Sequence, residues 1–189
     1  MSITQVLDAS CAANVTTCTS YMNELATNLT SSAYCATDYG MGNSVVVQAY
    51  LAAVAYQSLY SATCLKDVDT AQYCFANAIT NLTTPDNAYF YFLPLNQSLP
   101  QGAMPSCNTC LRQTMNIFQN AAANRKQPIA LTYVSAAQQV DAVCGPNFAN
   151  QTLPMALVQN LASARAPSWL LMMASLLAAG LWLLGGILL

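Results

Sequence analysis

Histidine is absent from this sequence, and charged side chains are scarce. Its 189 residues include five Lys and Arg and seven Asp and Glu, which gives a net charge of −2. Serine and cysteine nucleophiles usually depend on a histidine base, so the lack of histidine argues against that kind of catalysis. The few basic side chains form no patch that could neutralise the phosphates of a nucleic acid. We therefore expect no catalytic residues, no cofactor and no nucleic-acid partner.

Acidic residues are also too few and too scattered for most carboxylate chemistry. A glycosidase needs two carboxylates across a cleft, and a calcium loop needs several oxygen ligands at set spacings. Asp67 and Asp69 are the one close pair of acidic residues. We interpret Asp67 as part of a solvated turn and Asp69 as the cap of the helix that follows.

The last 21 residues, 169–189, carry no charge and run to the end of the sequence. As a helix they would span roughly 31 Å, about the thickness of the hydrocarbon core of a bilayer. Two interpretations stay open: a retained membrane-spanning helix, and a signal for attachment of a glycosylphosphatidylinositol (GPI) anchor. Because no basic residue follows Leu189, the GPI signal is favoured. Asn160 and Ala162, in the spacer 153–168, are the candidates for lipid attachment.

The cysteines all precede this tail, and they are Cys11, Cys18, Cys35, Cys64, Cys74, Cys107, Cys110 and Cys144. An even number in one small domain favours four disulfides if the chain is secreted. The spacing Cys107-Asn-Thr-Cys110 also suits a metal site, but zinc would need histidine or a second close pair. A regular helix would place Cys107 and Cys110 one turn apart, which does not suit a bridge between them. We therefore predict that each pairs elsewhere, with Cys144 as one candidate partner.

Sequons for N-glycosylation also favour an extracellular domain. They begin at Asn14, Asn28, Asn81, Asn96 and Asn150. Residues 1–8, however, have neither the basic nor the apolar region of a signal peptide. We therefore expect the natural start to lie upstream of Met1. The alternative is a cytosolic tail-anchored protein, in which the cysteines would stay reduced and the sequons unmodified.

The hydrophobic pattern predicts one mostly α-helical domain over residues 1–152. Helices are predicted at residues 18–29, 45–64, 70–80, 107–124 and 128–143. Ser44 and Asp69 are the predicted caps of the second and third helices, and Gly145, followed by proline, ends the last. Four prolines between residues 81 and 106 exclude a long helix there. Within this Pro-rich loop, residues 88–93 are predicted to be a short extended run.

Four consecutive aromatic residues, Tyr89, Phe90, Tyr91 and Phe92, are the most suggestive feature of this loop. Aromatic rings on a loop can stack on sugar rings or anchor a partner protein. They can also fasten a long loop onto a helical core. The sequence therefore leaves two interpretations of this run, a ligand contact and a structural anchor.

Several segments carry a family resemblance as a set. They are Cys64-Leu-Lys-Asp with Tyr73-Cys74-Phe-Ala-Asn-Ala78, then Tyr-Phe-Leu-Pro-Leu at 91–95, Pro-Ser-Cys-Asn-Thr-Cys-Leu at 105–111, Ser-Ala-Ala-Gln-Gln at 135–139 and Val-Cys-Gly-Pro at 143–146. Together they resemble a family of fungal secreted, cysteine-rich surface proteins of the GPI-anchored type, whose function is uncharacterised. The resemblance covers residues 3–152 and implies a signal peptide and further cysteines upstream of Met1. It implies no catalytic residue.

These features together predict a small disulfide-linked helical ectodomain with a structural or recognition role. The expected location is the extracellular face of the plasma membrane or the cell wall. The expected partners are the membrane, through the tail, and a cell-wall glycan or another surface protein. The alternative is an extracellular module that binds a glycan or small ligand through residues 89–93.

Overall fold

The predicted helical character is confirmed in a computed structural model, which describes residues 2–157. The elements are α1 (Ile3–Cys11), α2 (Val15–Leu29), α3 (Ala36–Gly40), α4 (Ser44–Thr63), α5 (Cys74–Thr80), the 3₁₀ helix η1 (Pro85–Leu95), α6 (Thr109–Ala121) and α7 (Ile129–Cys144). No strand forms within residues 2–157, where extended pairing is limited to one isolated bridge between Lys66 and Tyr73. None of the helices in this range is long and apolar enough to cross a bilayer. The predicted tail helix, Asn160 and Ala162 lie outside the described residues.

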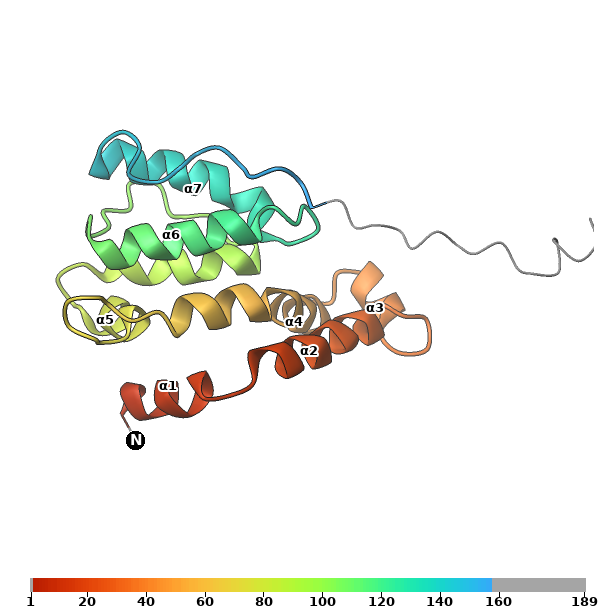
Figure 1. The fold of residues 1–189 in the computed structure, drawn as a ribbon. Helices are drawn as coiled ribbons and strands as arrows, with labels where there is room; N and C mark the ends of the chain where they lie inside the picture. The colour runs from red at the N-terminus through yellow and green to blue at the C-terminus, as the bar shows by residue number, and fades with distance from the viewer. Residues whose placement is uncertain (1, 158–189) are drawn as a thin grey trace, which may run out of the picture. The chain divides into compact units, whose positions relative to one another are not determined.

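The helices stack in layers, with α4 in the middle (Figure 1). Helix α4 contains no charged residue, and it contacts α2, α3, α5, η1 and α6. Its buried residues are Ala53, Ala55, Ser58 and Ala62, small side chains that let the neighbouring helices approach closely. Helices α1 and α2 form the outer layer on one side of α4. Helices α6 and α7 follow one another on the other side (Figure 1).

The main core lies between η1, α6 and α7. Leu111, Met115 and Phe118 form one stripe of α6 and are 7%, 0% and 0% exposed, which confirms the stripe that the sequence predicts. Tyr133 of α7 is also fully buried, and its hydroxyl donates to the Asn150 carbonyl at 2.8 Å. Burying large apolar side chains from three elements is the principal stabilising term of such a domain.

Local capping sets several helix ends. Helix α1 lies where the apolar pattern is too short to predict a helix, yet Ser2 and Gln5 form a capping box. Helix α4 is capped by Asn43 rather than by Ser44, since the Asn43 side chain accepts the Val45 N–H at 3.1 Å. Helix α7 ends at Gly145 as predicted, with φ at 95°, a value that favours glycine.

The predicted helix at residues 70–80 begins later, at Cys74. Asp69 does not cap it; instead Asp67 closes a turn, with its Oδ1 accepting the backbone N–H groups of Asp69 and Thr70, each at 3.0 Å. A short aspartate side chain can bond in this way to the backbone two and three residues ahead, which holds the chain in a turn rather than a helix.

The prediction of an extended run at residues 88–93 is wrong, because these residues belong to η1. Pro85 begins this helix and Pro94 lies inside it. Proline removes the N–H of an α-helical bond, and the tighter 3₁₀ geometry with its three-residue repeat forms instead. That repeat turns Tyr89 and Phe92 outward while Phe90 is buried.

Candidate functional site

Three disulfides join elements that are distant in the sequence. They are Cys11–Cys64, between the ends of α1 and α4; Cys74–Cys110, between α5 and α6; and Cys107–Cys144, between the segment before α6 and the end of α7. Cys107 and Cys110 therefore pair with different partners, as predicted, and Cys144 is one of them. The predicted helix, however, begins at Thr109 rather than at Cys107, so the two cysteines do not lie on one regular helix. Because the sulfurs of Cys107 and Cys110 are bonded, they do not provide the thiolates that the alternative zinc site would need.

Within the described residues there are three disulfides rather than the four expected, since Cys18 and Cys35 are not bonded. Cys18 lies in the first turns of α2, and the helix places it about 16 Å from Leu29 at the far end. Backbone hydrogen bonds of Ser31 to Asn28 and of Tyr34 to Ser31 then hold the following turn at that end. Cys35 consequently stays beyond the reach of a disulfide to Cys18.

The predicted glycosylation sites differ in how they are held. Asn81, Asn96 and Asn150 are exposed at or near turns. Asn14 is exposed as well, and its Oδ1 caps α2. Asn28 is half-buried in the last turn of α2. Asn28 is therefore the least accessible of the predicted acceptors, and modification of all five stays a prediction.

The aromatic run is divided between the core and the surface. Phe90 and Tyr91 are 1% and 7% exposed, and the Tyr91 ring packs edge-on against Phe75 at 4.8 Å between centroids. Tyr89 and Phe92 are 41% and 42% exposed. Phe90 and Tyr91 thus fasten η1 to the core, and they also line a cavity on the inner side of η1.

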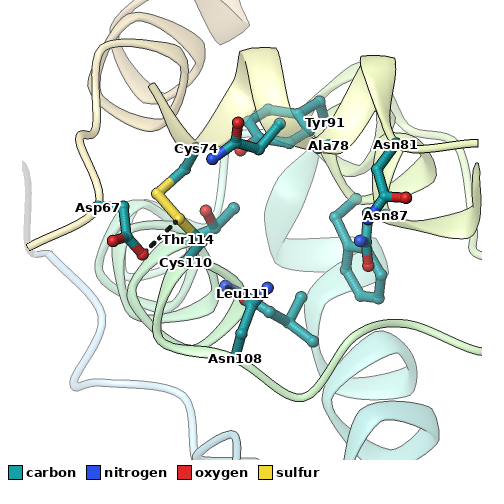
Figure 2. Close-up of a pocket in the computed structure, with 12 residues that line it drawn as sticks. Asp67, Cys74, Ala78, Asn81, Asn87, Tyr91, Asn108, Cys110, Leu111 and Thr114 are labelled. Carbon is teal, nitrogen blue, oxygen red and sulfur yellow. Dashed lines mark hydrogen bonds between the residues drawn. A yellow bond between two sulfur atoms is a disulfide. The ribbon is translucent and has the colours of Figure 1, made fainter. Parts of the chain in front are cut away.

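This cavity has a volume of about 90 Å³. It lies between the Asp67 turn, α5, η1 and α6. Its lining residues are Asp67, Cys74, Asn77, Ala78, Asn81, Asn87, Phe90, Tyr91, Asn108, Cys110, Leu111 and Thr114. Figure 2 shows Asp67 and the Cys74–Cys110 disulfide on one side and Asn81 and Asn87 on the opposite side. We call this space the Asn cavity, because four of its twelve lining residues are asparagines.

The four asparagines of the Asn cavity differ in the partners that they already have. Asn87 is fully engaged: its amide donates to Thr84 and Ser106, and its Oδ1 accepts the Ser106 N–H. Asn81 and Asn108 use only Oδ1, to close a turn at Thr83 and to cap α6 at Leu111. The amide of Asn77 and the Nδ2 atoms of Asn81 and Asn108 make no hydrogen bond within residues 2–157.

One carboxylate borders the Asn cavity. Hydrogen bonds from the Thr70 and Asp69 N–H groups lower the pKa of Asp67 below its ordinary value, so the group is anionic at neutral pH. Its Oδ2 lies 3.5 Å from Sγ of Cys110. That sulfur carries no hydrogen in the disulfide, so the contact is not a hydrogen bond and leaves Oδ2 able to accept one.

Asp67, Cys74 and Cys110 have potential metal-ligand atoms within 4.8 Å of one another. The two sulfurs, however, are bonded to each other. A disulfide does not offer thiolate ligands, and a single carboxylate does not make a cation site. The residues present therefore do not fit a metal.

Thr114 is the unusual group in the Asn cavity. It is 1% exposed, and its Oγ1 has no hydrogen-bond partner. Burial raises the pKa of Tyr91 to about 12, and the nearby Thr114 hydroxyl opposes this effect. The two hydroxyls nevertheless lack the geometry of a hydrogen bond. Buried polar atoms nearly always have a partner, and a water or a ligand hydroxyl in the cavity could supply the one that Thr114 lacks within the protein.

A second, wider groove of about 420 Å³ lies between α4 and α6. Val54, Ile117 and Leu157 supply apolar walls, and glutamine, asparagine and serine side chains supply the rest. It borders Leu157, where the described chain ends. None of its lining side chains is among the buried polar atoms without a partner in residues 2–157. The Asn cavity is therefore the better candidate site.

The sequence held a signal for part of the Asn cavity. Asn77 and Asn81 are four residues apart, which places both on one side of α5 and its end. Thr114 lies three residues after Leu111 and one before Met115, so it is a polar residue inside an apolar stripe. Asn108 was recognisable only as a helix cap.

Comparison with known proteins identifies a family but gives no information on the function of this site. A family model described as a domain of unknown function, DUF7729, matches residues 1–153. No curated protein and no solved structure matches the chain. The matched range includes every residue of the Asn cavity and all eight cysteines.

Proposed function

Because the chain belongs to the DUF7729 family, whose function is unknown, we propose from its own residues that it is a recognition domain displayed outside the cell. In this proposal the C-terminal segment holds the domain at the outer face of the plasma membrane or at the cell wall of a fungus, through a GPI anchor or a membrane-spanning helix. The domain itself does no catalysis.

The three disulfides are the observation that carries the location. They fit an extracellular or secreted protein, because cytosolic thiols are kept reduced. Each one closes a loop of at least 36 residues. Loops of this length give a large reduction of chain entropy in the unfolded state, by about 4 kcal/mol each in the loop-entropy model. The five sequons and the uncharged tail support the same location.

The chemistry of the Asn cavity supports recognition rather than catalysis. Asp67 is its one carboxylate, and amides, hydroxyls and apolar groups form the rest of its walls. The sequence has no histidine to act as a general base. Fixed neutral donors and acceptors around a small space are typical of binding sites.

A second candidate function is binding of a small ligand at the Asn cavity itself. The unpartnered Thr114 hydroxyl favours it over a purely structural role. The predicted ligand contact at residues 89–93 is then divided between two places. Phe90 and Tyr91 line the Asn cavity from the inner side of η1. Tyr89 and Phe92 are exposed on its outer side, where they could contact a protein partner.

Location can be tested with the full-length chain, produced in a fungal host behind an added signal peptide. We expect surface protein in which alkylation without reduction labels only Cys18 and Cys35, and labels all eight cysteines after reduction. Release by a phosphatidylinositol-specific phospholipase would support the GPI anchor, and detection of residues 169–189 by mass would support the retained helix. Eight free thiols and unmodified sequons in the protein expressed from its own full transcript, in the cells that naturally make it, would favour a cytosolic tail anchor instead.

A further inference from the structure

We infer that the Asn cavity binds an uncharged, hydroxyl-rich ligand, and that the group it takes is one edge of a sugar ring. The inference rests on the proposed recognition function and names the chemical class of ligand for that site. Its starting point is the set of side-chain atoms that the protein leaves without partners.

Those atoms include both donors and acceptors. Asn77, Asn81 and Asn108 are exposed residues of the lining, so the Asn77 amide and the Nδ2 atoms of the other two face solvent and can bond a ligand when Asn81 carries no glycan. Thr114 and Tyr91 add hydroxyls, which can donate and accept. Less than 1 Å² of the Thr114 Oγ1 is accessible, so a ligand hydroxyl reaches it only if the cavity wall yields slightly. A ligand hydroxyl also donates and accepts, so it can satisfy either kind of atom. A carbonyl or an ammonium group, in contrast, would satisfy only one kind.

The charge of the site argues for a neutral ligand. Asp67 is the one ionised group in the lining, so an anionic ligand would meet repulsion and no cation. Its Oδ1 already accepts three hydrogen bonds from residues 69 and 70, which leaves one oxygen for the ligand. That oxygen can accept a ligand hydroxyl. Because no second carboxylate lines the cavity, the attraction for a cation rests on this one group.

The size of the site sets how much of a ligand enters. A cavity of about 150 Å³ can hold a six-membered ring such as benzene. At about 90 Å³ the Asn cavity is smaller, so only part of such a ring fits inside. Phe90, Ala78 and Leu111 provide apolar wall for the C–H edge of the ring. Two or three hydroxyls inside the cavity, with the rest of the sugar outside, match this volume.

A test compares sugars that differ only in charge. The protein is the full-length chain made in a fungal host behind an added signal peptide, extracted in a zwitterionic detergent that carries no sugar. It carries Thr83→Ala, which removes the sequon at Asn81 while the backbone N–H of residue 83 can still bond Asn81 Oδ1. The probes are glucose, mannose, galactose and N-acetylglucosamine, with glucosamine as the cationic and glucuronate as the anionic counterpart. Saturation-transfer NMR detects binding near the millimolar range expected for one small ring.

Two variants assign the binding to the Asn cavity. Thr114→Val removes the orphan hydroxyl and keeps the shape, and Asn77→Ala removes the free amide. Each should weaken binding of the neutral sugar by roughly three- to tenfold, the effect of one hydrogen bond. Asn116→Ala is the matched control, because Asn116 is an exposed helix residue that does not line the cavity. It should leave the affinity unchanged.

Binding of at least one neutral sugar, weakened in Thr114→Val and Asn77→Ala but not in Asn116→Ala, would support the inference. A higher affinity for glucosamine or glucuronate than for the neutral sugars would overturn the inference that the ligand is uncharged. Equal affinity in all variants would show that the sugar does not bind in the Asn cavity. No binding by protein that is oxidised and displayed at the surface would overturn the inference of a sugar site as well. In that last case the proposed extracellular location stands, so the two proposals fail separately.

Discussion

Replacing Thr114 with valine should stabilise the unliganded protein, although the residue lies in the core of α6. The substitution exchanges a hydroxyl for a methyl group of nearly the same shape, and both residues are branched at Cβ. Thr114 is 1% exposed, less than 1 Å² of its Oγ1 is accessible, and this oxygen has no partner. The folded state therefore desolvates a hydroxyl without compensation.

The magnitude follows from that missing partner. An unsatisfied buried polar group costs about 1–3 kcal/mol, and the methyl that replaces it gains further apolar burial. We expect the free energy of unfolding to rise by about 1 kcal/mol, which corresponds to a rise of roughly 2–4 °C in the melting temperature.

Thr132→Val is a matched control for this prediction. Thr132 is 4% exposed, and its Oγ1 donates to the Leu93 carbonyl at 2.9 Å. The same substitution there breaks a buried hydrogen bond between α7 and η1, so it should lower the free energy of unfolding by about 1–3 kcal/mol. Urea unfolding of the oxidised proteins, followed by circular dichroism, measures both changes. A loss of stability in Thr114→Val as large as that in Thr132→Val would refute the reasoning, because it would mean that the Thr114 hydroxyl already has a partner.

Three further predictions concern the covalent framework and the titrating groups. Replacing Cys107 and Cys144 by serine should lower the free energy of unfolding by about 4 kcal/mol, since the bridge spans 37 residues; urea unfolding should show no comparable loss for Cys18→Ser, and an equal loss there would contradict the pairing. Burial raises the pKa of Tyr91 to about 12, so its contribution to the free energy of unfolding is complete below pH 10.0, its ordinary pKa, and is lost as the pH rises toward 12. Phenolate absorbance should therefore show that Tyr91 ionises only as the protein unfolds. Ionisation of all ten tyrosines in the folded protein would count against the burial of Tyr91. Burial acts to raise the pKa of Asp141, but hydrogen bonds from Ala149, Gln151, Asn147 and Phe148 lower it overall; the stabilisation is therefore present above pH 3.8 and is lost as the pH falls through the folded value. Asp141→Asn should remove part of this acid dependence of the melting temperature, and an unchanged dependence would argue against the role of Asp141.

The sequence predicted those features that depend on local pattern. The stripe Leu111, Met115 and Phe118 has a helical period and is buried in the structure. The spacing of Cys107 and Cys110 predicted that they do not bond to each other, and the structure pairs them separately, although Cys107 precedes α6. For the stripe, the geometry of a single helix is sufficient; for the cysteines, the outcome agrees with the prediction although they do not share one helix.

Features that depend on competition between local and distant contacts were not predictable in this way. Residues 88–93 have the composition of a strand, but prolines at 85 and 94 and contacts with α4, α5 and α7 favour a 3₁₀ helix. Cys18 and Cys35 complete an even set in the sequence, but most of α2 separates them in the structure and neither forms a disulfide. The Asn cavity requires α5, η1 and α6 to meet, which no single segment encodes.

The most direct test of the Asn cavity as a recognition site is to locate a bound sugar by NMR. The protein with selectively labelled methyl groups is titrated with the neutral sugar that binds most tightly, and intermolecular nuclear Overhauser effects are recorded. We predict effects between sugar ring protons and the methyl groups of Ala78, Leu111 and Thr114, which line the cavity. Effects confined to the exposed rings of Tyr89 and Phe92, or to methyl groups of the groove between α4 and α6 such as Val54, would contradict the account.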